Sequence, residues 1–241
     1  MRRLLSVCGR FVQVFSRTIL QLLYGLEFSG EIAPRYNLAP SQHALVLRLN
    51  SRNGTREIAR LKWGLVPAWV RDERSANKPI NARAETVEQK PFFREAFRRR
   101  RALIPVSGYY EWKKEHGKKQ PYLIGRKDEH PFSLAGLWER REQDGKVQET
   151  FTILTTAAAG LMTQIHERMP LIVSAESYDQ WLDRNTPAAE LQALLGPFSA
   201  TELVVHPVST IVNNPVNDTP QCIQPVQETT CYPPIAPDGG A

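Results

Sequence analysis

The sequence predicts an α+β fold: a single domain with strongly twisted antiparallel sheets, barrel-like in their arrangement, and flanking helices. Short segments rich in β-branched and aromatic residues follow one another between turn signals such as Asn53-Gly54 and Asp144-Gly145, a pattern typical of neighbouring antiparallel strands. Segments with helical spacing flank and interrupt these strands. No linker divides the 241 residues, a length that one domain with its own core accommodates.

The strands are expected between these turns. Asn53-Gly54 joins segments 44–49 and 56–63 into a hairpin, because Asn-Gly is the strongest short hairpin signal. His116-Gly117 marks a second turn. The further strands are expected at residues 102–106, 109–113, 122–125, 132–138, 150–156 and 171–173.

Four helices are expected around the sheets. Ser16 caps the first, in which apolar residues such as Leu20 and Leu23 recur at helical spacing, so that one face should join the core. The other three are expected at residues 91–99, at 174–182 with Ser174 as N-cap, and at 187–195 with Pro187 in the first turn.

Charge and cysteine content narrow the class of protein. The chain has 31 Lys and Arg against 25 Asp and Glu, a net charge of +6, which permits nucleic-acid contact without requiring it. Cys8, Cys222 and Cys231 show neither Cys-x-x-Cys spacing nor a His at zinc-ligand spacing, so no metal site is expected. Nothing in the sequence indicates a cofactor. A sparse, odd number of cysteines also fits a reducing cytoplasm.

The first residues do not form a complete secretion signal. Only Leu4, Leu5 and Val7 are apolar before Gly9 and Arg10, which is too short for the apolar region of a signal peptide. No stretch reaches transmembrane length either. We therefore expect a cytoplasmic protein with no membrane partner.

Four short segments carry reactive and polar side chains that no regular periodicity requires. They are Cys8-Gly9-Arg10-Phe11, Asn81-Ala82-Arg83-Ala84-Glu85, Glu111-Trp112 and Ile165-His166-Glu167-Arg168. Their arrangement resembles the SRAP family, the abasic-site-processing proteins also called SOS response-associated peptidases. Further matching segments are residues 35–40, 63–69, 108–114 and 206–208.

The resemblance runs from Cys8 to about Val226. It divides the chain into a leader of residues 1–7, a SRAP domain of residues 8–226 and a tail of residues 227–241. The tail is rich in proline and is expected to be disordered.

Cys8 is chemically special only as a first residue, because it then carries both a thiol and a free α-amine. Such an aminothiol condenses with an aldehyde: the amine forms a Schiff base and the thiol closes a five-membered thiazolidine. The α-amine titrates near ~8 and the thiol near ~8.5, so reactive forms exist at neutral pH. The resemblance implies that the aldehyde is the ring-opened sugar of an abasic site.

Residues Met1 to Val7 depart from the family, because a peptide bond before Cys8 acylates its amine. A GTG start codon read as Val7 would explain the extra residues, and so would removal of the leader by autoproteolysis. The third alternative is that the crosslinking chemistry is absent. Taken alone, Cys8 would be a buried core thiol, since free cysteine is among the most buried residue types.

Glu111 and His166 are the candidate acid–base groups. Aromatic neighbours should desolvate Glu111 and raise its pKa, and imidazole transfers protons near neutral pH. By resemblance, Asn81 hydrogen-bonds the sugar or the amine and completes a catalytic set with Cys8. The structural alternatives are a surface Glu111 paired with a lysine and a His166 that only stabilises its loop.

The same resemblance implies that Arg10, Arg83 and Arg168 contact DNA phosphates, for which the guanidinium fork is suited. Pairing with the carboxylates of Glu85 or Glu167 is the equally weighted alternative.

Trp69 resembles the family's exposed aromatic residue that stacks on bases of single-stranded DNA. Trp63 fits packing in the core better. The arginine run 98–101 could form a basic rim, but cations at a helix end are commonly just solvated.

These features predict a monomeric sensor of abasic sites that binds single-stranded DNA, forms a covalent crosslink through Cys8 and associates with the nucleoid when bound. A cysteine peptidase or lyase that acts mainly on its own N-terminus is the first alternative. A nonenzymatic single-stranded DNA-binding module is the second.

Overall fold

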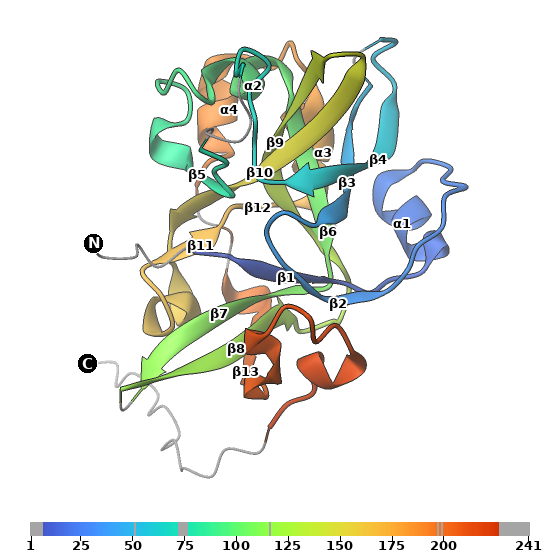
Figure 1. Ribbon diagram of the computed structural model, residues 1–241. Coiled ribbons are helices and arrows are strands. Elements are labelled where there is room, and N and C mark those ends of the chain that lie inside the picture. The colour runs from blue at the N-terminus through green and yellow to red at the C-terminus, as the bar shows by residue number, and fades with distance from the viewer. Residues whose placement is uncertain are drawn as a thin grey trace, which may run out of the picture.

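The computed structural model describes residues 7–50, 52–71, 77–115, 117–196, 198 and 200–226 of the chain (Figure 1). Within these residues the protein is an α+β domain in which two sheets pack on a shared core. The fold class therefore agrees with the expectation. The proposed tail and the first six residues of the proposed leader lie outside the described residues.

The first sheet has five strands in the order β13-β8-β7-β1-β2. Their bounds are β1 Arg10–Gln13, β2 Arg35–Leu38, β7 Gly108–Glu115, β8 Lys118–Arg126 and β13 Leu203–Pro207. All of its pairings are antiparallel. The first strand of the chain therefore lies inside this sheet, between β7 and β2.

The second sheet closes into a barrel, because β10-β4-β3-β6-β9 ends with β9 pairing back onto β10. Strands β5, β11 and β12 add to its margins. The bounds are β3 His43–Leu49, β4 Arg56–Trp63, β5 Asn81–Arg83, β6 Arg101–Val106, β9 Phe132–Gln143, β10 Lys146–Ala157, β11 Arg168–Pro170 and β12 Ile172–Val173.

Two features of the sheets were not expected. Strand β10 runs parallel to both β4 and β5, whereas only antiparallel neighbours were predicted. Strands β1, β2, β5, β11 and β13 were not predicted at all. Each has only three to five residues, which is too short to show a clear alternation of buried and exposed positions.

The helices begin close to the predicted positions and are shorter. Their bounds are α1 Arg17–Tyr24, α2 Arg94–Arg99, α3 Tyr178–Leu182 and α4 Ala188–Ala193. The Ser16 side chain caps α1 by accepting from the Ile19 N–H, and Gly25 ends it in the left-handed conformation. Leu20 is buried as expected, but Leu22 is 80% exposed. Ser174 precedes a 3₁₀ turn rather than the α-helix itself.

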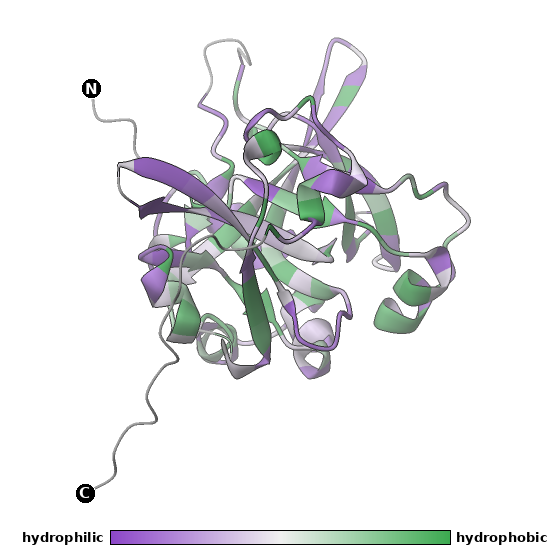
Figure 2. Ribbon diagram, turned by 90° about the horizontal axis from the view of Figure 1, so that it is seen from below, coloured by the Kyte–Doolittle hydropathy of each residue, from purple (hydrophilic) through white to green (hydrophobic). Residues whose placement is uncertain are grey.

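One core cluster fills the barrel and the space between it and the five-stranded sheet, and a second packs the helices on the barrel. The largest fully buried side chains of the first cluster include Trp63, Trp138 and Tyr109, and Trp63 stacks on Phe151. Hydrophobic strand segments occupy the middle of the molecule, while the far end of the β7–β8 hairpin is hydrophilic (Figure 2). Trp63 is thus a core residue.

The arginine run 98–101 is only partly a surface feature. Arg101 is buried and donates to backbone carbonyls of α2 and α3, including those of Phe97 and Trp181. Arg100 pairs with Glu139 at 2.8 Å. The basic rim is thereby reduced to the two exposed residues at the end of α2.

Candidate functional site

Cys8 lies directly before β1, at the centre of the candidate site. Its side chain is fully buried, and its φ is +45°, a left-handed conformation that is strained for a residue with a Cβ. Its backbone N–H donates to Oε1 of Glu111 at 2.5 Å. Burial, followed by the neighbouring Glu111, raises the pKa of the thiol, so the thiol is held protonated in this arrangement.

Glu111 reaches Cys8 because β1 pairs with β7. The register places Arg10 opposite Tyr110 and Phe11 opposite Tyr109, so residue 111 lies alongside the start of β1. The side chain is only 2% exposed. Burial raises its pKa to about 8, against the smaller lowering effect of the N–H groups of Cys8 and Trp112. Near neutral pH this carboxyl can therefore both hold and release a proton.

Asn81 approaches from the other sheet. It begins β5, which β10 holds in parallel register with Asn81 opposite Ile153. Its Nδ2 donates to the carbonyl oxygen of Val7, while its Oδ1 is buried with no hydrogen-bond partner among the described residues. Asn81 and Glu111 therefore hold the two sides of the Val7–Cys8 peptide bond, at its oxygen and at its nitrogen.

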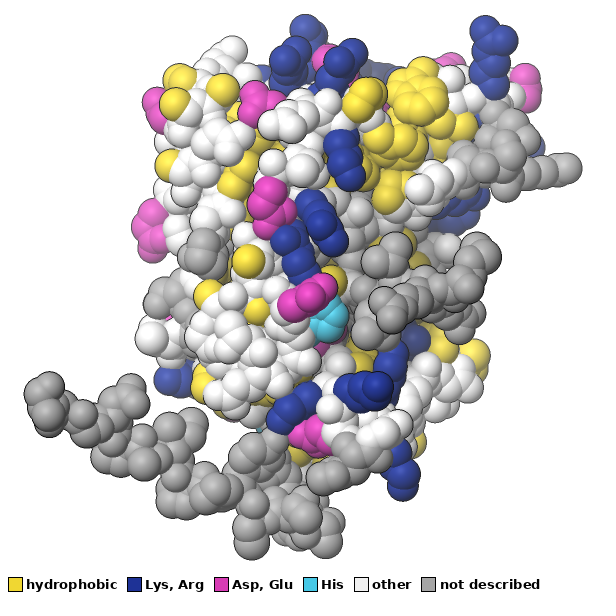
Figure 3. Space-filling view, turned by 90° about the vertical axis from the view of Figure 1, so that its left-hand side faces the viewer, with side chains coloured by type: hydrophobic (Ala, Val, Ile, Leu, Met, Phe, Trp, Pro, Cys, Tyr) yellow, Lys and Arg dark blue, Asp and Glu magenta, His cyan; other side chains and the backbone are white. Residues whose placement is uncertain are grey.

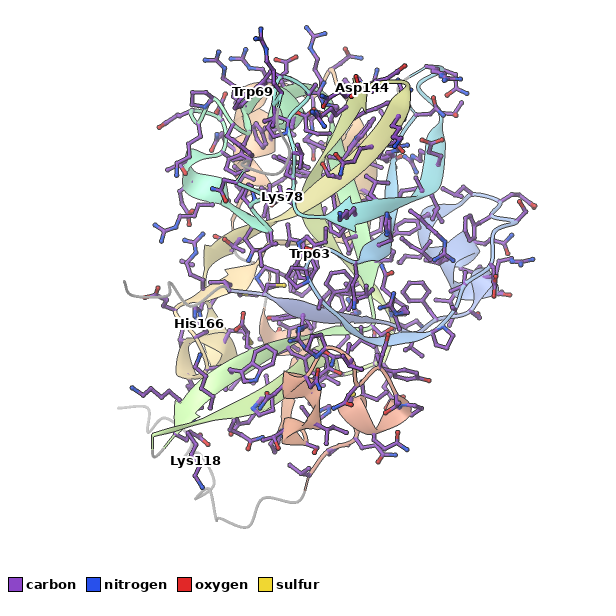
Figure 4. All side chains as sticks on the ribbon, in the orientation of Figure 1. Trp63, Trp69, Lys78, Lys118, Asp144 and His166 are labelled. Atoms are coloured by element: carbon purple, nitrogen blue, oxygen red, sulfur yellow. The ribbon has the colours of Figure 1, made fainter. Side chains whose placement is uncertain are left out.

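His166 lies on the same side of the molecule as the start of β1 (Figure 4). Its Nδ1 accepts from the Arg168 N–H at 3.0 Å, so Nε2 carries the proton in the neutral imidazole. The side chain is half-buried. No hydrogen bond within the described residues joins it to Cys8 or Glu111.

Arg168 pairs with a carboxylate. Its Nη1 and Nη2 donate to the two oxygens of Glu85 at 2.7 and 3.0 Å, and Nη2 also donates to the carbonyl oxygen of Thr155 at 2.6 Å. The pair with Arg168 lowers the pKa of Glu85. Arg168 is thus paired with a carboxylate, which was the expected alternative to phosphate contact.

Arg83 differs from Arg168 in its contacts, although their strands, β5 and β11, both pair with β10. Arg83 lies opposite Thr155 on one side of β10, and β11 pairs with β10 on the other. The Arg83 side chain is exposed, and no hydrogen bond or ion pair joins it to the part of the chain that the structure describes. It is a free cation beside the site.

The Arg10 side chain forms hydrogen bonds within the domain. Its Nη1 donates to Oδ1 of Asn37 at 2.8 Å and to the carbonyl oxygen of Val212 at 2.7 Å, and its guanidinium lies 5.8 Å from the centroid of the Trp112 ring. Burial lowers its pKa. These contacts tie β1 to the segment after β13.

Trp69 is 65% exposed and stands edge-on to Phe92, with ring centroids 5.8 Å apart. Figure 4 places it at the end of the molecule away from the β7–β8 hairpin. Figure 3 views this flank and shows a hydrophobic patch at its upper end, with Lys and Arg side chains spread from top to bottom. An exposed aromatic ring is suited to stacking on nucleic-acid bases.

Tyr109 is a site residue that motif comparison did not single out. It is fully buried, and its hydroxyl has no hydrogen-bond partner among the described residues. Burial raises its pKa, with further contributions from Cys8 and Glu111. The signal in the sequence was period-two alternation, which puts Tyr109 and Glu111 on one face of β7.

Two other classes of site have no counterpart among the described residues. The described residues contain no group of three or more His, Cys, Asp or Glu side chains that could hold a metal ion. Among the same residues, no helix is long and apolar enough to cross a membrane.

Comparison with known proteins gives consistent matches. The family model of the SOS response associated peptidase (SRAP) matches residues 7–215. The chain is 40% identical over 225 residues to the abasic site processing protein YoqW of Bacillus subtilis (strain 168), covering 90% of this chain and 99% of YoqW. It is 34% identical over 230 residues to the abasic site processing protein YedK of Escherichia coli (strain K12), covering 91% and 100%. A crystal structure of a protein from Bacteroides thetaiotaomicron matches with a TM-score of 0.82 and 28% identity, covering 91% of this chain and 100% of that one.

Proposed function

Because the chain belongs to the SOS response associated peptidase (SRAP) family, we propose that it processes abasic sites in DNA. In this proposal Cys8 forms a covalent crosslink with the ring-opened sugar of an abasic site in single-stranded DNA. The observation that carries it is the 2.5 Å contact between the Cys8 nitrogen and Glu111. This contact places a carboxyl with a pKa of about 8 at the atom that would act as the nucleophile.

The reaction has two steps once the Cys8 amine is free. The amine adds to the aldehyde carbon, and the carbinolamine loses water to give an imine. Protonated Glu111 supplies the proton that leaves with this water, and the amine returns one to the carboxylate. The Cys8 sulfur then adds to the imine carbon, and its proton passes to the nitrogen, closing a thiazolidine. The Nε2–H of His166 is suited to protonate the sugar oxygen during ring opening.

The DNA strand would be held by contacts that carry no sequence information. Arg83 forms no ion pair within the described residues and lies on the same short strand as Asn81, and Trp69 offers an exposed ring for stacking. Phosphate contact and base stacking are both largely sequence-independent. This fits a substrate in which the base to be read is missing.

A second activity follows from the held Val7–Cys8 bond: cleavage of the chain's own leader. The Asn81 amide donates to the Val7 oxygen and would stabilise negative charge there. The Cys8 thiol would add to the Val7 carbonyl carbon, and the C–N bond would break as Glu111 protonates the Cys8 nitrogen. Water would then hydrolyse the resulting thioester, leaving a free amine and a free thiol on Cys8.

Intact mass and denaturing gels test both activities. Protein that begins at Cys8 should form a denaturation-resistant adduct with a single-stranded oligonucleotide containing an abasic site, and Cys8→Ala should form none. If Cys8→Ala forms the adduct as well as the parent, the thiazolidine proposal is wrong. For leader cleavage, the full chain should lose the mass of residues 1–7 over time. If the chain keeps its leader and binds DNA without forming an adduct, the remaining alternative is a nonenzymatic DNA-binding module.

A further inference from the structure

The loop of residues 66–71 carries Trp69, and a buried arginine holds its second half through the backbone. Arg141 on β9 donates from Nε to the carbonyl oxygen of Val70 and from Nη2 to that of Arg71, each at 2.8 Å. Because both donors belong to one planar guanidinium, they fix two neighbouring peptide groups relative to each other. The chain directly after Trp69 therefore has a defined direction.

Two further side chains hold the first half of the same loop. Glu139 on β9 accepts from the Ala68 N–H, and the Thr150 hydroxyl on β10 accepts from the Val66 N–H at 2.9 Å. Arg100 pairs with Glu139 at 2.8 Å and balances its charge. The loop is thus anchored on both sides of its exposed aromatic residue.

The three holding residues lie on one face of the β9–β10 hairpin. Glu139 and Arg141 are two residues apart on β9, and side chains alternate between the two faces of a strand. Thr150 is directly opposite Glu139 in the register, so these two share a face. In Figure 4, Trp69 lies at the same end of the molecule as Asp144, in the turn of this hairpin. We call Glu139, Arg141 and Thr150 the loop clamp.

Stability alone does not favour the loop clamp. All three of its residues are buried, and burying charged side chains costs free energy that apolar side chains of similar size would not cost. Surface loops, moreover, ordinarily leave their backbone groups to water. The ring on this loop is itself exposed, edge-on to Phe92. The loop clamp therefore fixes the position of an exposed ring rather than filling the core.

We propose that the loop clamp positions Trp69 for stacking on a base of single-stranded DNA. The inference rests on the proposed function, in which Trp69 is the stacking ring. A loop that is already fixed loses little conformational freedom when DNA binds, so more of the stacking energy contributes to affinity. Arg141 donates to the loop backbone, and it therefore acts through Trp69 and not as a phosphate contact.

A double-mutant cycle tests the proposal. The full-length chain and its variants are titrated with a labelled oligothymidine at several salt concentrations. Arg141→Gln should weaken binding about fivefold or more, as should Trp69→Ala, with an unchanged log–log salt slope, because the loss is one of stacking. In the Trp69→Ala background, Arg141→Gln should change the affinity by less than about twofold, because the ring that Arg141 positions is already gone.

Arg140→Gln is the matched control. It removes the same charge at the next position of β9, where the side chain lies on the opposite face and pairs with Glu142 at 3.4 Å. It should bind DNA like the parent. Equal weakening by Arg140→Gln and Arg141→Gln would show a net-charge effect and overturn the proposal. An Arg141→Gln effect of the same size with and without Trp69 would also overturn it.

Two further measurements separate the loop clamp from the fold and from the chemistry. Thermal melting shows whether Arg141→Gln folds. If it does not, Thr150→Val replaces it in the cycle, because this change keeps the side-chain volume and removes only the acceptor for the Val66 N–H; parental affinity of the folded variant would overturn the proposal. Adduct formation by the parent that begins at Cys8 reports on crosslinking separately. Its absence would contradict the proposed crosslink, while the binding cycle would still decide on the loop clamp.

Discussion

Glu111→Gln should stabilise the fold, by an amount that grows with pH. The buried carboxyl has a pKa of about 8 in the folded chain, against 4.5 as its ordinary value. The folded state therefore holds a proton that the unfolded chain releases between these two pH values. Because the folded pKa is the raised one, stability is greatest below pH 4.5 and falls as the pH rises toward 8.

The two pKa values set the size of the effect. Ionisation of Glu111 lowers the free energy of unfolding by about 1 kcal/mol at pH 5.5, about 3 kcal/mol at pH 7.0 and about 5 kcal/mol at pH 8.5. Glutamine has no charge to bury, and its amide oxygen can still accept from the Cys8 N–H. The stability difference between variant and parent should follow these values.

Urea denaturation at the three pH values measures the difference. Both proteins carry Cys8→Ala, which keeps the peptide bond before residue 8 intact. Glu27→Gln, at an exposed position in the loop after α1, is the control and should change stability by less than about 0.5 kcal/mol. A Glu111→Gln difference that stays constant from pH 5.5 to 8.5 would refute the reasoning, because it would mean that the carboxyl is not held neutral by burial.

Four further variants separate binding, stability and chemistry. Arg83→Ala should weaken single-stranded DNA binding about fourfold at 0.15 M salt and reduce the salt slope by about 0.7. Equal slopes for Arg83→Ala and the parent would place the phosphate contact elsewhere. Arg168→Ala should instead lower the melting temperature, because it leaves Glu85 without its partner. Trp69→Ala should cost about 1–3 kcal/mol of binding with no change in slope, measured by fluorescence titration, and unchanged affinity would contradict a stacking role. His166→Ala should slow adduct formation by a factor of about 100 to 10,000, while its affinity for intact single strands should equal that of the parent. If the variant forms the adduct on denaturing gels as fast as the parent, His166 does not belong to the catalytic set.

The sequence predicted the parts of the fold that carry strong local signals. Asn53-Gly54 indicated the hairpin that became β3 and β4, and Ser16 indicated the start of α1. Strands β1 and β5 carry no such signal. They form because β7 and β10 offer them hydrogen-bond partners far away in the sequence, and a local pattern cannot show that.

The same limit applies to the candidate site. The resemblance indicated Cys8, Asn81 and Glu111, and in the structure Glu111 accepts from the Cys8 N–H while Asn81 donates to the preceding carbonyl oxygen, that of Val7. Motifs could not tell Arg83 from Arg168, because only the fold places Glu85 next to one of them. The raised pKa of Glu111 was expected from aromatic neighbours, but its main cause is complete burial between the sheets.

The position of β1 inside the five-stranded sheet has a consequence for the order of events during synthesis. Cys8 leaves the ribosome well before β7, because its contact with Glu111 closes a separation of 103 residues, and such long-range pairings form late in folding. Until β7 has emerged, the thiol is exposed to the cell without its acid–base partner. Afterwards its side chain is fully buried. An external peptidase that cleaves the Val7–Cys8 bond therefore meets this bond free of its contacts with Asn81 and Glu111 only before β1 docks.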